Sequence, residues 1–131
     1  DGPGGRDLWQ LDSWDGGRSW GGPRRIASGL PPHLLKLADG RLLLTYGCRN
    51  YHGTDWVFPP SSIRARVSTD HGAGWSDEFI LIEDSPLPDM GYPSTVELAD
   101  GTLFTLWYDD RRRSGQPYFL RHLHWRLEEH S

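Results

Sequence analysis

The sequence contains a single cysteine, Cys48, and this scarcity excludes two classes of protein. One thiol can form neither an intrachain disulfide nor a zinc site built on several cysteines. No run of about 18 apolar residues occurs, and no signal-peptide core is visible, so neither a membrane-spanning helix nor a secretory leader is indicated. A soluble chain is expected. It begins at Asp1 rather than at Met, which is compatible with a processed or excised piece, and the compartment is left open.

The sequence also has only a small excess of charge of one sign. The 14 Lys and Arg residues stand against 18 Asp and Glu residues, which gives a formal net charge of −4. A small acidic excess provides no basic surface for nucleic acid or for an anionic membrane, so neither is expected as a partner.

Long helix-forming stretches of Ala, Glu and Lys are missing as well. In their place the 131 residues include 16 Gly, 10 Pro and 7 Trp. This mixture favours many short strands joined by tight turns, and it predicts an all-β protein.

One eight-residue motif, S-x-D-x-G-x-x-W, occurs twice, at 13–20 and at 68–75. Its Ser and Asp side chains can accept hydrogen bonds from turn N–H groups, its Gly can take a positive φ, and its Trp can pack over the hairpin. We call the motif the Asp box and predict that its aspartates are structural turn residues rather than catalytic acids. The motif positions are Ser13, Asp15, Gly17 and Trp20 in the first copy and Ser68, Asp70, Gly72 and Trp75 in the second.

A second motif alternates with the first. Leu-Ala-Asp-Gly occurs at 37–40 and again at 98–101, each time before a β-rich run. An Asp-Gly pair between such runs predicts a two-residue hairpin turn, because glycine accepts the positive φ that the turn needs. Together the motifs predict nine short strands and no helix. The expected strands are 7–13, 23–27, 33–37, 41–46, 62–68, 79–83, 94–98, 102–108 and 118–126.

Two connections are longer than hairpin turns. The segment 47–61 is rich in aromatic residues, among them Tyr51, Trp56 and Phe58, and loops of this kind commonly display binding groups. The segment 109–117 carries a run of charges, which predicts a solvated tip.

Paired Asp boxes with Leu-Ala-Asp-Gly hairpins between them resemble the bacterial-neuraminidase repeats of the sialidase superfamily. The stretch 63–75, followed by Gly-Tyr-Pro-Ser at 91–94, is similar to the later blades of that family. The resemblance covers about 6–126 and implies a six-bladed β-propeller of four-stranded antiparallel sheets. Residues 1–131 would then be one propeller segment of two to three blades. The expected parts are the end of one blade at 6–27, a full blade at 31–83 and most of a third at 92–126.

The resemblance also implies a site. In active members of the family, arginines bind the carboxylate of sialic acid and a tyrosine is the nucleophile. Tyr92 matches that tyrosine, because it stands just before the strand that leads into the second Leu-Ala-Asp-Gly turn; alternatively, it is an aromatic packed at the start of the blade. Pro93 departs from the family pattern and could rotate the ring. Aligning the two turns places Tyr92 opposite Pro31, so blade architecture does not demand a tyrosine there.

Three arginines are candidates for substrate binding. Arg64 and Arg66 alternate on the strand that enters the second Asp box, where the family's third arginine is expected, with Ile63, Ala65 and Val67 on the opposite face. Arg49, just beyond the strand 41–46, is the third candidate. The alternative for all three is a solvent-exposed charge.

Other polar residues carry weaker signals. His122 and His124 alternate on one strand without a visible third ligand, so exposed histidines and no metal site are expected. Asp109 and Glu97 are possible carboxylate partners for the tyrosine. The sequence indicates no cofactor.

Two functions remain open. The first is a sialidase-like glycoside hydrolase, or a fragment of one, that cleaves or binds a terminal sialic acid or a related acidic sugar. The second is a non-catalytic propeller module that binds glycan or protein through its aromatic loops. The family's first arginine and its acid–base aspartate come from early blades that this chain lacks. The rest of a larger propeller, or further copies of the chain closing the ring, would have to supply them.

Overall fold

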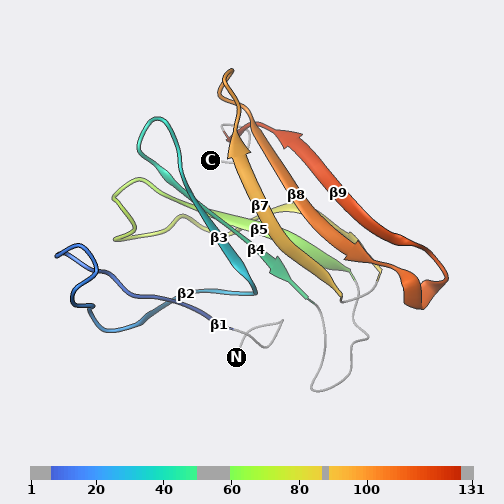
Figure 1. Cartoon of the computed structure of the whole chain (residues 1–131), viewed down its shortest axis with the longest axis horizontal. Helices are drawn as coiled ribbons and strands as arrows, with labels where there is room; N and C mark the ends of the chain where they lie inside the picture. Colours follow the sequence, from blue (N-terminus) through green and yellow to red (C-terminus); the bar gives the residue numbers. More distant parts are fainter. Residues whose placement is uncertain (1–6, 50–59, 87–88, 128–131) are drawn as a thin grey trace.

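The computed structural model describes residues 7–49, 60–86 and 89–127, and in these residues the chain is all-β (Figure 1). The only helical element described there is a single 3-10 turn, Arg112–Ser114, and no helix in these segments is long and apolar enough to cross a membrane. The strands are β1 (Asp7–Gln10), β2 (Arg24–Ser28), β3 (Pro32–Lys36), β4 (Leu42–Cys48), β5 (Ser61–Ser68), β6 (Phe79–Ser85), β7 (Met90–Glu97), β8 (Leu103–Asp110) and β9 (Tyr118–Trp125).

The strands form three antiparallel sheets. We call them the N-terminal sheet (β1–β2), the central sheet (β3–β6) and the C-terminal sheet (β7–β9). They contain two, four and three strands, which is the grouping that the repeats predict. Within each sheet the strands follow chain order, so strands that are consecutive in the sequence are neighbours in the sheet.

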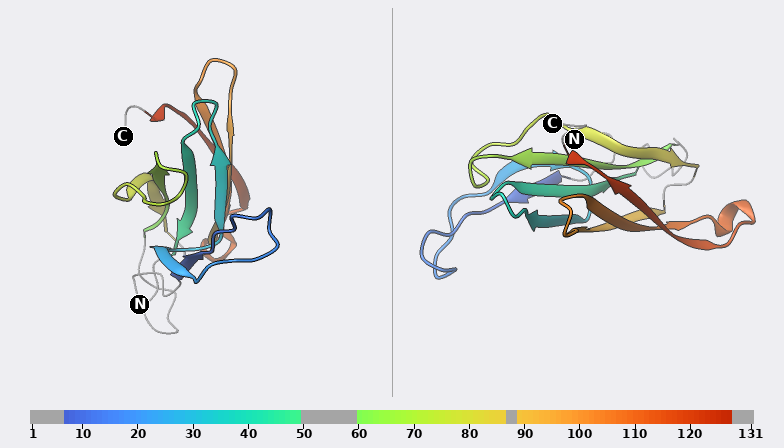
Figure 2. Two further views of the ribbon diagram at one scale, coloured as in Figure 1. Left: turned by 90° about the vertical axis from the view of Figure 1, so that its left-hand side faces the viewer. Right: turned by 90° about the horizontal axis from the view of Figure 1, so that it is seen from above.

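The central sheet lies between the other two (Figures 1 and 2). One of its faces packs Leu44 and Tyr46 against Leu8 and Ala27 of the N-terminal sheet. Its other face packs against the C-terminal sheet around a cluster of buried side chains: Leu37, Leu43, Ala65, Val67, Leu103, Trp125 and Leu127. The apolar core is therefore two layers, one in each gap between sheets.

The alternation predicted for β5 is confirmed. Ile63, Ala65 and Val67 are buried toward the C-terminal sheet, and Arg64 and Arg66 project from the opposite face. A strand that is covered on one face fixes its side-chain register in this way, because a slip of one residue would exchange the two sets.

The two Asp boxes make the same turn hydrogen bonds, as their shared motif predicts. Ser Oγ accepts from the glycine N–H two positions after the Asp, at 2.8 Å from both Gly17 and Gly72. Asp Oδ1 accepts a second backbone N–H, from Ser19 at 2.9 Å and from Gly74 at 2.8 Å. Both motif glycines have positive φ, 89° and 86°.

The boxes differ in burial, and this difference predicts unequal effects of the same substitution. Ser68 is 1% exposed, whereas Ser13 lies at the surface. Ser68→Ala should lower the free energy of unfolding by about 1–3 kcal/mol, because the buried Gly72 N–H loses its acceptor. Ser13→Ala should cost less, because water can reach the N–H of Gly17. Urea denaturation of both variants tests this, and equal losses would contradict it.

The Leu-Ala-Asp-Gly turns correct one prediction: the loop has three residues rather than two. In the first turn Leu37 donates its N–H to the carbonyl of Arg41 at 2.8 Å, and Gly40 donates to the carbonyl of Leu37 at 2.9 Å. The turn at 98–101 repeats both bonds. A tight turn closed by a glycine of positive φ is the usual form of a three-residue hairpin loop, and Gly40 has φ 94°.

Strand β7 also differs from its expected range, since it begins at Met90 rather than at residue 94. Its pairing with β8 changes register between two consecutive pairs of residues. Gly91 lies opposite Tyr108, and the next pair is Ser94 opposite Leu106. Tyr92 and Pro93 therefore face one residue of β8 in a β-bulge. A bulge leaves a residue unpaired, so the missing N–H of proline breaks no ladder bond there.

Candidate functional site

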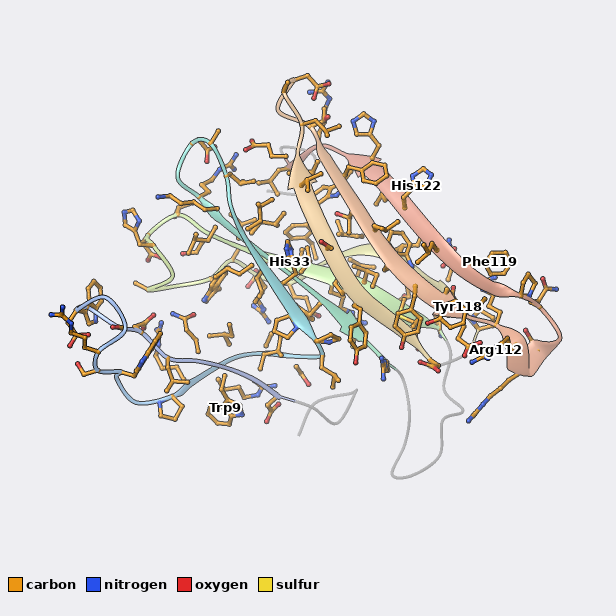
Figure 3. All side chains as sticks on the ribbon, in the orientation of Figure 1. Trp9, His33, Arg112, Tyr118, Phe119 and His122 are labelled. Atoms are coloured by element: carbon orange, nitrogen blue, oxygen red, sulfur yellow. The ribbon has the colours of Figure 1, made fainter. Side chains whose placement is uncertain are left out.

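The ends of β4 and β8 and the starts of β7 and β9 meet at one end of the sheets, opposite the Leu-Ala-Asp-Gly turns (Figure 1). An open hollow of about 450 Å³ lies at this end. Figure 3 shows Arg112 and Tyr118 of this group beside the connection between β8 and β9. The residues that line the hollow are Asp89, Tyr92, Tyr108, Asp110, Arg112 and Tyr118.

Tyr92 is the most exposed aromatic side chain of the hollow, at 62%. The bulge gives it a φ of 55°, which is uncommon for a bulky residue and turns the side chain out of the regular strand alternation. Its ring lies 5.5 Å from the ring of Tyr108, and Tyr108 in turn stacks on Tyr118 at 5.6 Å. The three rings form a continuous aromatic row.

Tyr108 connects a cation to a carboxylate. Its hydroxyl accepts a hydrogen bond from Arg49 Nη2 at 2.8 Å and donates one to Asp89 Oδ1. Burial raises the pKa of the Tyr108 phenol well above its usual range, and the bond to Asp89 raises it further. Tyr108 therefore stays protonated at neutral pH and holds Arg49 in place.

Arg49 directly follows β4 of the central sheet but bonds to the C-terminal sheet. Besides Tyr108, its Nε donates to the carbonyl of Met90 at 2.9 Å. No carboxylate in the described part of the chain forms an ion pair with it.

The arginine that lines the hollow forms an ion pair with a neighbouring carboxylate. Arg112 binds Asp110 through Nε at 2.9 Å and Nη2 at 2.8 Å. The hydrogen bonds from Arg112 lower the pKa of Asp110 to about 2, so the pair is charged at neutral pH. Arg112 therefore contributes little net charge to the hollow.

Close packing of two glycines sets the distance between the central and C-terminal sheets beside Arg49. A methyl group added at Gly47 would lie 3.2 Å from the Cα of Gly91 and 2.9 Å from the carbonyl oxygen of Leu30. Real side chains do not fit at such distances without movement of the backbone. The absence of side chains here allows β4 and β7 to approach closely.

Arg64 and Arg66 do not line the hollow that contains Tyr92. Arg64 makes ion pairs with Glu78 at 2.6 Å and Glu83 at 3.2 Å, and Arg66 donates to the carbonyl of Ser76 at 2.8 Å. These contacts lie within the central sheet and its Asp box. Substrate binding by either arginine stays a prediction.

The run of charges at 109–117 is not simply a solvated tip. Asp109 is fully buried and accepts hydrogen bonds from Ser85, Arg111 and Arg121. Arg121 also pairs with Asp84 at 2.6 Å. The first two residues of the run, Asp109 and Asp110, belong to β8 and are both buried.

The remaining candidates have structural contacts. His122 stacks on Phe104 at 5.1 Å, and His124 shares a 2.6 Å hydrogen bond with Thr102. Glu97 accepts the backbone N–H of Ala38 at 2.8 Å. Among residues 7–49, 60–86 and 89–127 no three potential ligands gather to hold a metal ion. Tyr51, Trp56 and Phe58 lie outside the described residues.

Of the six residues that line the hollow, only Tyr92 was predicted as a site residue; the other five are Asp89, Tyr108, Asp110, Arg112 and Tyr118. The signal that could have found Tyr108 is the repeat itself. Aligning the two Leu-Ala-Asp-Gly turns places Tyr108 opposite Gly47, just as it places Tyr92 opposite Pro31. At both positions the second repeat has a tyrosine where the first repeat has a different residue, so the fold of the repeat does not require a phenol there.

Comparison with known proteins gives a structural neighbour of unknown function. No protein-family model and no curated protein matches the sequence. The chain is similar to the crystal structure of a protein of unknown function from Dyadobacter fermentans DSM 18053, with 29% sequence identity and a TM-score of 0.68. The match covers 87% of this chain and 29% of that chain. The sequence therefore spans less than a third of the length of this neighbour, and the likeness extends over nearly all of the sheets described above.

Proposed function

We propose that the three sheets are consecutive blades of a sialidase-like β-propeller, and that the Tyr92 end of them binds a terminal sialic acid or a related acidic sugar. Together with the rest of a complete ring, this end cleaves the glycosidic bond. The observation that carries the proposal is the convergence of Tyr92 and Arg49 around Tyr108. An exposed phenol at the hollow, with the guanidinium of Arg49 bonded to the neighbouring Tyr108, suits a sugar that bears a carboxylate.

The proposed chemistry assigns a role to each group. The Tyr92 oxygen bonds to the anomeric carbon as the bond from that carbon to the leaving oxygen breaks. The phenol proton passes to a carboxylate, for which Asp89 of the same hollow is the candidate, and the leaving oxygen takes a proton from an acid elsewhere in the ring. A neutral phenol approaches an anionic sugar more readily than a carboxylate does, because like charges repel. Water then releases the sugar from Tyr92.

Binding is tested first, by titrating the chain with methyl α-sialoside and following the NMR shifts. Arg49→Lys should weaken the affinity about tenfold or more, because lysine keeps the charge but loses the planar fork that binds a carboxylate through two bonds. Arg64→Lys is the matched control and should leave the affinity unchanged, since the Arg64 guanidinium is already occupied by Glu78 and Glu83. The reverse result would make Arg64 the binding arginine.

A second candidate function is a non-catalytic module that binds glycan. It is favoured by the aromatic row itself, because exposed tyrosine rings provide flat apolar surfaces on which a sugar ring can stack. It predicts that sialosides bind without being cleaved. Tyr92→Ala would then lose affinity, whereas Tyr92→Phe would keep it.

A further inference from the structure

The Tyr108 hydroxyl lies between two groups of opposite charge. It accepts a hydrogen bond from Arg49 Nη2 at 2.8 Å and donates one to Asp89 Oδ1. The guanidinium and the carboxylate are therefore bonded to the same oxygen atom. Among the described residues, however, no ion pair joins Arg49 to Asp89 directly. A hydroxyl thus occupies the place where two attracting charges would otherwise meet.

This hydroxyl is neutral at physiological pH. Burial raises the pKa of the Tyr108 phenol, and the hydrogen bond to Asp89 raises it further. A neutral phenol can accept one hydrogen bond and donate another at the same time. It therefore satisfies the cation on one side and the carboxylate on the other without adding a charge of its own.

Each charged partner is also held by a bond that does not involve Tyr108. Arg49 Nε donates to the carbonyl of Met90 at 2.9 Å. The backbone carbonyl of Asp89 accepts the N–H of Asp110 at 2.9 Å. Removal of the phenol oxygen would leave both residues anchored on either side of the vacated position. The guanidinium and the carboxylate would then be within reach of each other.

Two other arginines show what happens when no hydroxyl intervenes. Arg112, at the same hollow, binds Asp110 directly through two hydrogen bonds of 2.9 and 2.8 Å. In the central sheet, Tyr46 donates to Oε2 of Glu78, yet Arg64 reaches Oε1 of the same carboxylate at 2.6 Å. A tyrosine that lies beside an arginine and a carboxylate therefore does not separate them. Separation requires a hydroxyl between the two groups.

We propose that Tyr108 is a positioning residue that keeps Arg49 and Asp89 apart, so that the guanidinium can bind the carboxylate of an acidic sugar. A guanidinium that pairs with Asp89 through its planar fork would lose that fork for a ligand. The separation also leaves Asp89 a better acceptor for the Tyr92 proton, because a carboxylate beside a cation holds its negative charge more firmly. The inference deepens the proposed function and rests on it for the identity of the ligand.

A pair of variants tests the proposal by titration with methyl α-sialoside, followed by NMR. Tyr108→Phe should weaken the affinity about tenfold or more, because Arg49 then pairs with Asp89. Adding Asp89→Asn to this variant should restore most of the affinity, since a neutral amide does not attract the guanidinium. A role of Tyr108 in packing alone predicts no such recovery, because the second substitution returns no packing.

Two single variants are the controls. Tyr118→Phe removes a hydroxyl from the same row of rings, and within the described residues no hydrogen bond joins that hydroxyl to Arg49 or Asp89. Its affinity should equal that of the wild type. Asp89→Asn alone should also keep the affinity, because the amide oxygen can still accept the Tyr108 hydroxyl. Circular dichroism checks that every variant is folded.

A crystal structure of the Tyr108→Phe variant tests the separation without any ligand. An Arg49 nitrogen should lie within about 4 Å of an Asp89 oxygen, the distance of an ion pair. If the two groups stay apart, or if Asp89→Asn restores no affinity, the proposal is wrong. If the wild-type chain binds no sialoside, the proposed function fails instead, and the crystal structure alone decides whether Tyr108 separates the two charges.

Discussion

Tyr92→Phe should lower the rate at which the chain, together with the rest of its ring, releases sialic acid from a fluorogenic sialoside by about a thousandfold or more. The change removes one oxygen and keeps the ring. The contact with Tyr108 and the bulge that displays residue 92 therefore persist, and the stability of the fold should change by less than about 0.5 kcal/mol. A loss of this size can arise only if the oxygen takes part in the reaction.

The control for this experiment is Tyr118→Phe. Tyr118 lines the same hollow, is also exposed and stacks on Tyr108, but nothing assigns a reaction to its hydroxyl. Its variant should keep most of the activity. If the chain together with the rest of its ring releases no sialic acid from any sialoside, the hydrolase proposal is wrong and the glycan-binding module takes its place. If Tyr92→Phe is as active as the wild type, another group is the nucleophile.

The largest expected loss of stability follows from Asp109→Ala. Asp109 is fully buried, and its Oδ2 accepts from Arg111 Nη2 at 2.9 Å and from Arg121 Nη1 at 3.2 Å. Removing the carboxylate leaves two guanidinium groups and the hydroxyl of Ser85 without their common acceptor. A buried ion pair that loses one partner costs about 3–5 kcal/mol. Because Arg111 and Arg121 remain partly in contact with water, we expect a decrease of about 2–4 kcal/mol in the free energy of unfolding.

Asp84→Ala is the matched control, because Asp84 binds the same Arg121 side chain at 2.6 Å. Its side chain is 46% exposed, so water replaces it readily and the loss should be about 0–1 kcal/mol. Guanidinium denaturation of both variants gives the comparison. Similar losses would show that the burial of Asp109 does not determine its contribution.

The repeated motifs predict most of the fold because their physics is local. An Asp box closes its own hydrogen bonds within a few residues, so Ser13 and Ser68 could be assigned from the sequence alone. The same holds for the alternation of β5. The predicted length of the Leu-Ala-Asp-Gly loop was wrong because an Asp-Gly pair suits both two-residue and three-residue turns. The choice between them depends on how the flanking strands pair.

The site was harder to predict because its contacts join segments far apart in the sequence. The alternation of β5 predicts the face of the sheet from which the Arg64 side chain projects. It does not predict that Glu78 and Glu83 form ion pairs with Arg64 on that face. In the same way, nothing near Arg49 in the sequence indicates that Tyr108 and Met90 accept hydrogen bonds from its guanidinium. Tyr92 could be found because the resemblance and the repeat both single it out. The bulge that displays it depends on a pairing with β8 that the sequence around Pro93 does not reveal.

The glycine contact between Gly47 and Gly91 has a thermodynamic consequence for any ligand of this hollow. Arg49 directly follows β4 of one sheet and Tyr92 lies in β7 of another, so the pair exists as a unit only while the two sheets are docked at that contact. A ligand that bridges Arg49 and Tyr92 binds the docked state alone. By mass action it stabilises that state by about 2.7 kcal/mol at a hundredfold excess over its dissociation constant. Saturating ligand should therefore slow amide hydrogen exchange on both sides of the β4–β7 boundary together, although each sheet would touch only half of the bound molecule.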